Sequence, residues 1–174
     1  EYNQLSRIIS MLGMPPAYML ERGRQTHEFF NAHTDSFGRT VYQLKPMEQF
    51  SREHRVQEQA SKQYFPGTTL PEVIRLTPIS RRSSRASDAE KEMANRAAFT
   101  DFVAGLLNLN PLERWTPQQA KLHPFITGEP FTEPWQPPDM VAAKTAASAA
   151  VAATATAAAV AATTSNKADA VAQD

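Results

Sequence analysis

The apolar positions at the start of the chain follow a helical period. This pattern predicts an amphipathic helix over residues 1–12, which ends at Gly13 and at the two prolines that follow. A second short helix is expected over 17–22. The positions that carry the first pattern are Tyr2, Leu5, Ile8, Ile9 and Leu12.

A second group of helices is predicted further along the chain. Ser87 and Glu90 have the spacing of a capping box, which opens a helix that runs to about 107. Another capping box starts at Thr116, and the helix after it is expected to end at His123 because proline follows. The apolar face of the longer helix comprises Met93, Ala97, Phe102, Val103, Leu106 and Leu107.

The segments between these helices carry weaker signals. Thr40, Val41 and Tyr42 favour strand, and the turn residues before them predict a hairpin over 29–44. The remaining predictions are an ordered loop over 45–64, one helical turn over 70–75, an exposed mobile loop over 79–88 and an extended segment over 132–138.

Composition narrows the class of protein. The chain has 174 residues, a net charge of zero and no cysteine. These values exclude a disulfide scaffold and a thiolate metal site, and they give no field that attracts nucleic acid or anionic membrane. The last 34 residues include 17 alanines, which predicts a disordered or weakly helical tail.

Residues 98–126 read as a helix, a turn with one arginine, a capped helix and a His-Pro stop. This order resembles the end of a eukaryotic protein kinase catalytic domain. The first sixteen residues resemble helix G of the CMGC kinases, and 16–94 matches the CMGC insert in position. Within that group the chain is most similar to the DYRK family and its fungal Yak kinases, through the stretches YQLKPMEQFSREH, YFPGTTLPEVI and NPLERWTPQQAKLHPFI.

The resemblance sets the expected fold and domains. It implies a mainly α fold, in which 1–138 is part of a kinase C-lobe with helices G, H and I and the insert over 16–94. The low-complexity tail is expected over 139–174. Because the chain starts at Glu1 inside a predicted helix, we interpret it as a piece of a longer protein. Without its packing partners, the isolated piece is expected to be unfolded, molten or prone to aggregation.

The resemblance also implies an activity for the parent protein. Such a kinase autophosphorylates on tyrosine, uses ATP and Mg²⁺, and phosphorylates Ser/Thr near proline or arginine. Arg114 matches the arginine that pairs with the glutamate closing the activation segment. Pro111, Trp115 and His123 are assigned structural roles in the same region.

The chain itself lacks the motifs of phosphoryl transfer. No two of its six glycines are close enough for a glycine-rich phosphate loop. Three short stretches resemble other kinase motifs, but each departs from its pattern and their order is wrong; they are 53–56, 35–38 and 70–72. We therefore expect no catalytic, cofactor-binding or metal-binding residue here.

The segment SRRSSRAS carries the candidate modification sites. Arg81 and Arg82 precede Ser84 by three and two residues, which is a pattern that basophilic kinases recognise. Ser84 and Ser87 are the candidate phosphorylation sites. A phosphate there would add negative charge beside several arginines and order the loop.

Two functions from different classes follow. The first is a fragment of a dual-specificity Ser/Thr kinase. The alternative is a non-catalytic interaction module left from a kinase gene. Both imply protein substrates or docking partners, no nucleic acid and no membrane, and a location in the cytoplasm, the nucleus or both.

Overall fold

The computed structural model describes residues 1–60, 62–78, 86–132 and 134–148. In these ranges the fold is mainly α-helical with one two-stranded sheet, which confirms the predicted fold class. The chain divides into two compact units, Glu1–Glu133 and Pro134–Asp174. The predicted division lay slightly later, after residue 138.

Three short helices begin the first unit. They are α1 (Tyr2–Leu12), α2 (Ala17–Arg22) and α3 (Thr26–Phe29), and the first two confirm the predicted ranges. Gly13 ends α1 with a φ of 89°, a conformation that side chains rarely adopt, and its N–H donates to the Ile9 carbonyl.

The predicted hairpin is confirmed. Strands β1 (Phe30–Thr34) and β2 (Thr40–Leu44) pair antiparallel, with Phe30 opposite Leu44 and Thr34 opposite Thr40. Asp35 holds the turn, because its Oδ1 accepts the N–H groups of Phe37 and Arg39. These hydrogen bonds, that from Arg39 first, lower the pKa of the Asp35 carboxyl.

The loop predicted over 45–64 was wrong in its first half, where helix α4 (Met47–His54) forms. The helix contributes one buried aromatic ring, Phe50, and so shows no helical period in the sequence. Phe50 stacks on Tyr2 of α1, with ring centroids 4.7 Å apart, and on Phe29 at 5.4 Å. Long-range aromatic packing, which the sequence pattern does not reveal, therefore stabilises α4.

Lys45 lies between the end of β2 and the start of α4. Its Nζ donates to the His27 carbonyl at 2.7 Å and to Glu53 Oε2 at 2.6 Å. The Tyr2 hydroxyl donates to the Lys45 carbonyl at 2.6 Å. Because the Lys45 side chain is only 9% exposed, the Glu53 carboxylate compensates for a charge that would otherwise be costly to bury.

Helix α5 (Leu70–Leu76) extends beyond the single turn that the sequence predicted. A capping box starts it: Thr69 accepts the Glu72 N–H, and the Glu72 carboxylate accepts backbone N–H groups in return. Hydrogen bonds from the Thr68 and Thr69 N–H groups lower the pKa of Glu72. The Thr-x-x-Glu spacing of Thr69 and Glu72 is the sequence signal for the start of this helix.

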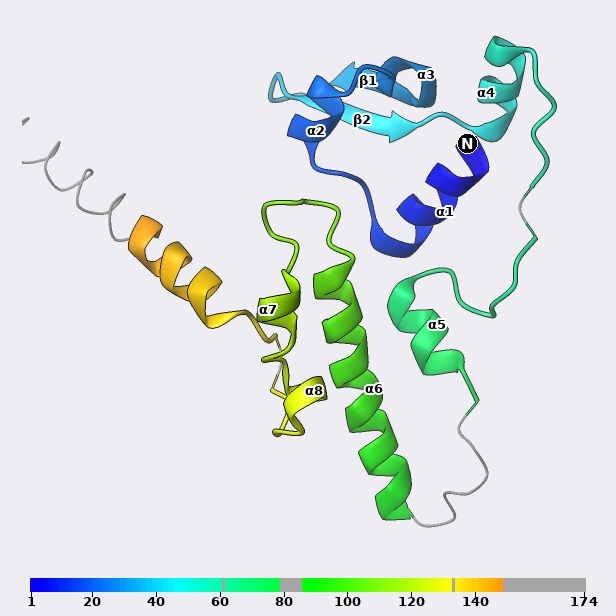
Figure 1. Ribbon diagram of the computed structural model, residues 1–174. Coiled ribbons are helices and arrows are strands. Elements are labelled where there is room, and N and C mark those ends of the chain that lie inside the picture. The colour runs from blue at the N-terminus through cyan, green and yellow to red at the C-terminus, as the bar shows by residue number, and fades with distance from the viewer. Residues whose placement is uncertain (61, 79–85, 133, 149–174) are drawn as a thin grey trace, which may run out of the picture. The chain divides into compact units, whose positions relative to one another are not determined.

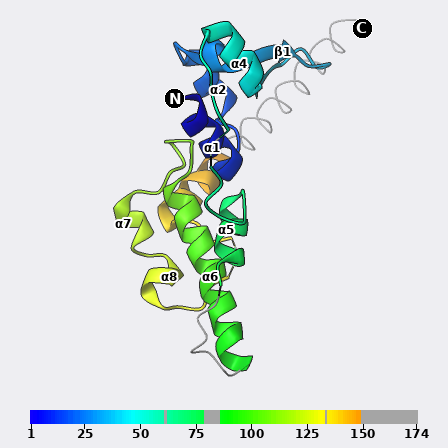
Figure 2. The same cartoon turned by 90° about the vertical axis from the view of Figure 1, so that its right-hand side faces the viewer.

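Helix α6 (Ala86–Leu106) is the longest element of the described chain. It contacts α5, α7 and α8, with α5 along one side and the two short helices along another (Figures 1 and 2). Since the helix begins at Ala86, the loop predicted over 79–88 was wrong for its last three residues. Residues 79–85 lie outside the described ranges.

Helices α7 (Pro117–Ala120) and α8 (Pro124–Thr127) follow the turn after α6. The capping box at Thr116 is confirmed, with Gln119 as its partner. The second of these helices was not predicted. The chain does leave the α region at His123, but Pro124 then occupies the first position of a new helix, where its missing N–H costs nothing.

In the second unit, residues 138–148 are helical. The extended segment predicted over 132–138 therefore ends one residue early, at 137. Lys144 Nζ donates to Gln136 Oε1 at 3.1 Å, which holds the start of this helix. Residues 149–174, most of the predicted tail, lie outside the described ranges.

Many large apolar side chains of the first unit remain exposed. In α1 the only buried residue is Tyr2, and Ile8 is exposed. Exposed apolar side chains on α6 and α8 are Met93, Phe99, Phe125 and Ile126. Their burial would stabilise a fold by about 1.5–3 kcal/mol each, and here that contribution is incomplete.

We therefore predict that the isolated 174-residue chain unfolds without a sharp transition. Near-UV circular dichroism should change gradually with temperature, and the dye ANS should bind at 25 °C, as it does to loosely packed states. A single cooperative transition without ANS binding would contradict this expectation.

Candidate functional site at the arginine turn and the α1 groove

The turn between α6 and α7 is built on two asparagines. Asn108 Oδ1 accepts the Asn110 N–H at 2.9 Å, and Asn110 Oδ1 accepts the Leu112 N–H at 3.1 Å. The Tyr18 hydroxyl also donates to Asn110 Oδ1, at 2.7 Å. Pro111 stands directly after Asn110, whose carbonyl accepts the N–H groups of the two residues that close the turn.

Arg114 lies at the end of this turn, which we name the arginine turn (residues 108–115). Its Nε donates to the Asn108 carbonyl at 2.7 Å, and its Nη2 reaches the Leu109 carbonyl at 3.5 Å. The side chain is exposed and forms no ion pair with any described residue. The turn thus holds a guanidinium in place and leaves N–H donors for a carboxylate.

Trp115 packs directly against the backbone of α6. The backbone N–H of Trp115 donates to the Gly105 carbonyl at 3.1 Å. A Cβ atom at position 105 would lie 2.3 Å from the indole ring, so only glycine permits this approach. The Trp115 and His123 rings lie 5.5 Å apart.

His123 is fully buried at the junction of α7 and α8. Its Nδ1 accepts the Phe125 N–H at 3.0 Å, so Nδ1 carries no proton. The ring is therefore the Nε2–H tautomer, and Nε2 donates to Asp101 Oδ2 of α6 at 3.0 Å. The ring packs against Phe102, Trp115 and Phe131. This geometry supports a structural role.

Comparison with known proteins shows which sequences this chain is similar to. The chain is 45% identical over 142 residues to the dual specificity protein kinase YAK1 of Saccharomyces cerevisiae. The matched region covers 79% of the chain and 18% of the relative. The chain is 47% identical over 133 residues to the serine/threonine-protein kinase ppk15 of Schizosaccharomyces pombe, covering 76% of the chain and 24% of the relative.

The chain belongs to the Yak-type protein kinases. A probable serine/threonine-protein kinase yakA of Dictyostelium discoideum is also similar, at 40% identity over 150 residues, with 79% of the chain and 10% of the relative covered. The chain thus spans a quarter or less of the length of these relatives. No family model matches the chain.

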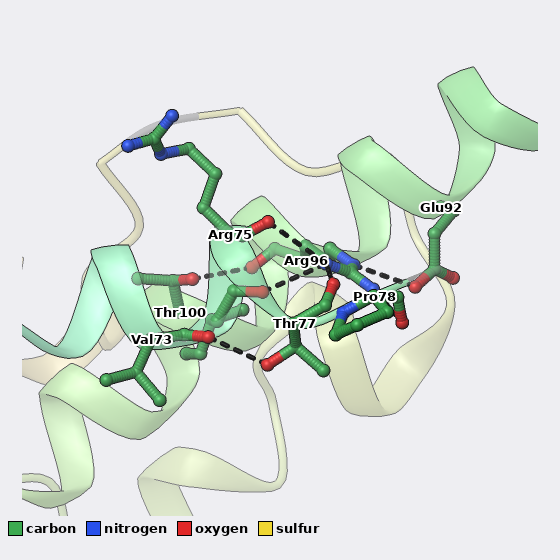
Figure 3. Close-up of polar contacts among 8 residues, drawn as sticks. Val73, Arg75, Thr77, Pro78, Glu92, Arg96 and Thr100 are labelled. Atoms are coloured by element: carbon green, nitrogen blue, oxygen red, sulfur yellow. Dashed lines mark hydrogen bonds and ion pairs between the residues drawn. The ribbon is translucent and has the colours of Figure 1, made fainter. Parts of the chain in front are cut away.

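The Yak-type chain contains a polar cluster that the sequence analysis missed, the Arg96 clamp. Arg96 of α6 donates from Nη1 to the carbonyls of Ile74 at 3.0 Å, Arg75 at 3.3 Å and Thr77, and from Nη2 to Pro78 at 3.4 Å (Figure 3). Its Nε pairs with Glu92 at 2.8 Å. The guanidinium therefore satisfies the carbonyl end of α5.

A groove of about 400 Å³ runs beside α1, and we name it the α1 groove. Arg7 and Lys62 flank the Tyr64 ring, with cation-to-centroid distances of 5.3 and 5.8 Å. Neither cation pairs with a described carboxylate, and no described residue lining the groove is acidic. Its other polar lining residues include Asn3, Ser6, Ser10, Gln63 and Thr68.

The three stretches that resemble catalytic motifs have structural roles. Residues 35–38 form the hairpin turn, and 70–72 begin α5. In 53–56, Glu53 pairs with Lys45, and this hydrogen bond lowers the pKa of the Glu53 carboxyl. Arg55 ends α4 in the left-handed conformation.

Of the two candidate phosphorylation sites, the structure describes the backbone of Ser87 alone. Ser84 lies outside the described residues. Ser87 lies inside the first turn of α6, which begins at Ala86, so it is not the N-cap residue that the sequence predicted, and its side chain is not among those described.

Among the described residues, no group of three or more metal-ligating side chains comes together. No described helix has the length and apolarity needed to cross a membrane.

Replacing His123 with phenylalanine tests the buried ring. Phenylalanine keeps the aromatic volume but leaves the Phe125 N–H and the Asp101 carboxylate unpaired, which should cost about 1–3 kcal/mol. Hydrogen–deuterium exchange should increase in the segment 116–131. The matched control is Leu122→Ala at an exposed neighbour, which should change local stability by no more than about 0.5 kcal/mol. Equal exchange in both variants would argue against the structural role.

Proposed function

We propose that this chain is part of the catalytic domain of a dual-specificity Yak-type Ser/Thr kinase, on the C-terminal side of the domain. The observation that carries the proposal is the identity of 40–47% to Yak-type kinases over more than three quarters of the chain. The arginine turn, with its capped helix and His-Pro junction, also supports the assignment.

In the parent protein the reaction would be transfer of the γ-phosphoryl group of ATP to Ser/Thr hydroxyls, with Mg²⁺. Such catalysis consists mostly of positioning and charge stabilisation by a lysine, two aspartates and the metal ions. The chain's role would be to stabilise the C-lobe of the domain and to form part of the surface that protein substrates contact. None of its residues is assigned a catalytic step.

Arg114 is the residue through which this part would act on the rest of the domain. The family resemblance pairs it with a glutamate outside this chain. A planar guanidinium suits that task, because it binds a carboxylate through two parallel N–H donors. The two bonds to the carbonyls of Asn108 and Leu109 support a preorganised arginine.

The test uses the full-length protein that contains this chain. Arg114→Ala should lower both phosphate transfer from ATP to a protein substrate and thermal stability, by about 3–5 kcal/mol if the pair is buried. Arg114→Lys should restore little, since lysine lacks the fork. Glu113→Ala, at the exposed neighbouring residue, is the control. A wild-type full-length protein without ATP-dependent transfer would refute the kinase proposal.

The α1 groove favours a second candidate, a module that binds acidic protein segments. Two cations that form no ion pair with a described carboxylate lie beside an exposed tyrosine ring, and Arg7 also donates to the Lys62 carbonyl at 2.9 Å. In a groove lined by hydroxyls and amides, they provide charge and hydrogen bonds to an anionic peptide. This function requires no catalysis and is compatible with the first.

A decaglutamate peptide provides a direct probe of the α1 groove. Replacing both Arg7 and Lys62 with alanine should weaken its binding to the full-length protein by about tenfold, as expected for two exposed charge pairs. Arg22→Ala and Lys121→Ala together remove the same charge from other exposed positions and should have little effect. Fluorescence anisotropy measures both, and equal losses would exclude the groove.

A further inference from the structure

The Arg96 clamp ends at an exposed threonine followed by a proline. Thr77 is the C-cap residue of α5, with an extended backbone of φ −63° and ψ 127°, and its side chain is exposed. Pro78 keeps the backbone of the preceding Thr77 out of the α region. We propose that Thr77 is a phosphate-acceptor site for proline-directed Ser/Thr kinases, and that its phosphate competes for the Arg96 guanidinium.

A second Thr-Pro pair in the same chain provides an internal comparison. The sequence has two such dipeptides, Thr77-Pro78 and Thr116-Pro117. Thr116 Oγ1 accepts the Gln119 N–H and also contacts Gln119 Oε1, so it is held within a capping box. Thr77 Oγ1 makes one described hydrogen bond, to the Val73 carbonyl at 2.8 Å. Its hydroxyl is therefore the easier one to release.

Charges around Thr77 favour a phosphate. Arg75 precedes it by two residues, and Figure 3 shows the Arg75 side chain pointing away from Arg96. The Arg75 side chain is exposed and is therefore accessible to a modifying enzyme. Arg96 already donates to the carbonyl of Thr77 itself, which places a guanidinium beside the modified residue.

The modification is an ordinary phosphoryl transfer. Thr77 Oγ1 attacks the γ-phosphorus of ATP bound to the modifying kinase, and the bond from that phosphorus to the β–γ bridging oxygen breaks. ADP leaves, and a base of the modifying kinase accepts the hydroxyl proton. The product carries a charge of about −1.5 to −2 at neutral pH.

The phosphate should loosen the end of α5. The modified oxygen no longer donates to the Val73 carbonyl, and negative charge at the carbonyl end of a helix is unfavourable. Arg96 is the adjacent cation, and the Nη1 N–H groups that it turns toward the phosphate are taken from carbonyls of residues 74–77. Phosphorylation therefore replaces a backbone clamp with a side-chain pair.

The first experiment measures which threonine is modified. The phosphatase-treated full-length protein is incubated with ATP and a purified proline-directed kinase, and mass spectrometry follows both sites. Thr77 should gain phosphate about tenfold faster than Thr116, the order of protection that an N-cap bond gives. Pro78→Ala should abolish the reaction at Thr77 alone. Equal rates, a faster reaction at Thr116 or no phosphate on Thr77 would overturn the proposal.

A parallel reaction without the added kinase measures autophosphorylation. Because the added enzyme supplies the activity, the result at Thr77 does not depend on whether this protein is itself an active kinase. Failure of the proposed kinase function would show as no transfer in this control, while the Thr77 result would stand or fall separately.

The second experiment tests competition for Arg96. Hydrogen–deuterium exchange of the segment 70–78 should increase after phosphorylation and exceed that of Thr77→Val, which removes the hydroxyl donor without adding charge. Arg96→Gln should reduce the exchange difference between the phosphorylated and unmodified proteins to the difference that Thr77→Val produces. Exchange that is unchanged by phosphate, or equal to that of Thr77→Val, would refute the competition.

Discussion

The hydrogen bonds from the Arg96 guanidinium to the end of α5 are the interaction on which the packing of α5 against α6 depends. A seven-residue helix such as α5 is too short to be stable by itself and leaves its last carbonyls without partners. Arg96 supplies donors to four carbonyls around that end from a side chain only 13% exposed. Glu92, one turn earlier on α6, balances the charge. One residue therefore fixes both the end and the position of α5.

The opposite side of α6 is organised by the same principle. Asp101 accepts the Nε2–H of His123, and the other ring nitrogen caps α8. Two helices of four residues each are thereby attached to α6 through one imidazole. In both cases a polar side chain completes the hydrogen bonds of a short element, and apolar packing adds to it. Such junctions are specific because a shift of α6 breaks every bond at once.

The sequence predicted what is encoded locally. Gly13 ended α1, the Asp35 turn defined the hairpin, and the Thr116 capping box opened α7, because each of these signals acts within a few residues. Helix α4 was missed because its stability comes from Phe50 stacking on Tyr2, far away in the chain. The Arg96 clamp was missed for the same reason, since an arginine in a helix does not reveal which carbonyls it will meet. At the candidate site, motifs identified the arginine turn, whereas the α1 groove arises only when 62–68 folds back beside α1.

The close contact between Trp115 and Gly105 has a genetic consequence. Alanine is the smallest replacement that adds a side chain, and even its single methyl group would overlap the indole ring. Every missense allele at this codon therefore displaces the tryptophan that joins the arginine turn to α6, and through it the neighbouring imidazole. A saturation screen would report a position as intolerant as a catalytic one, although it carries no reactive group. A map of essential residues would therefore suggest a catalytic role for Gly105, although the position is needed only for packing.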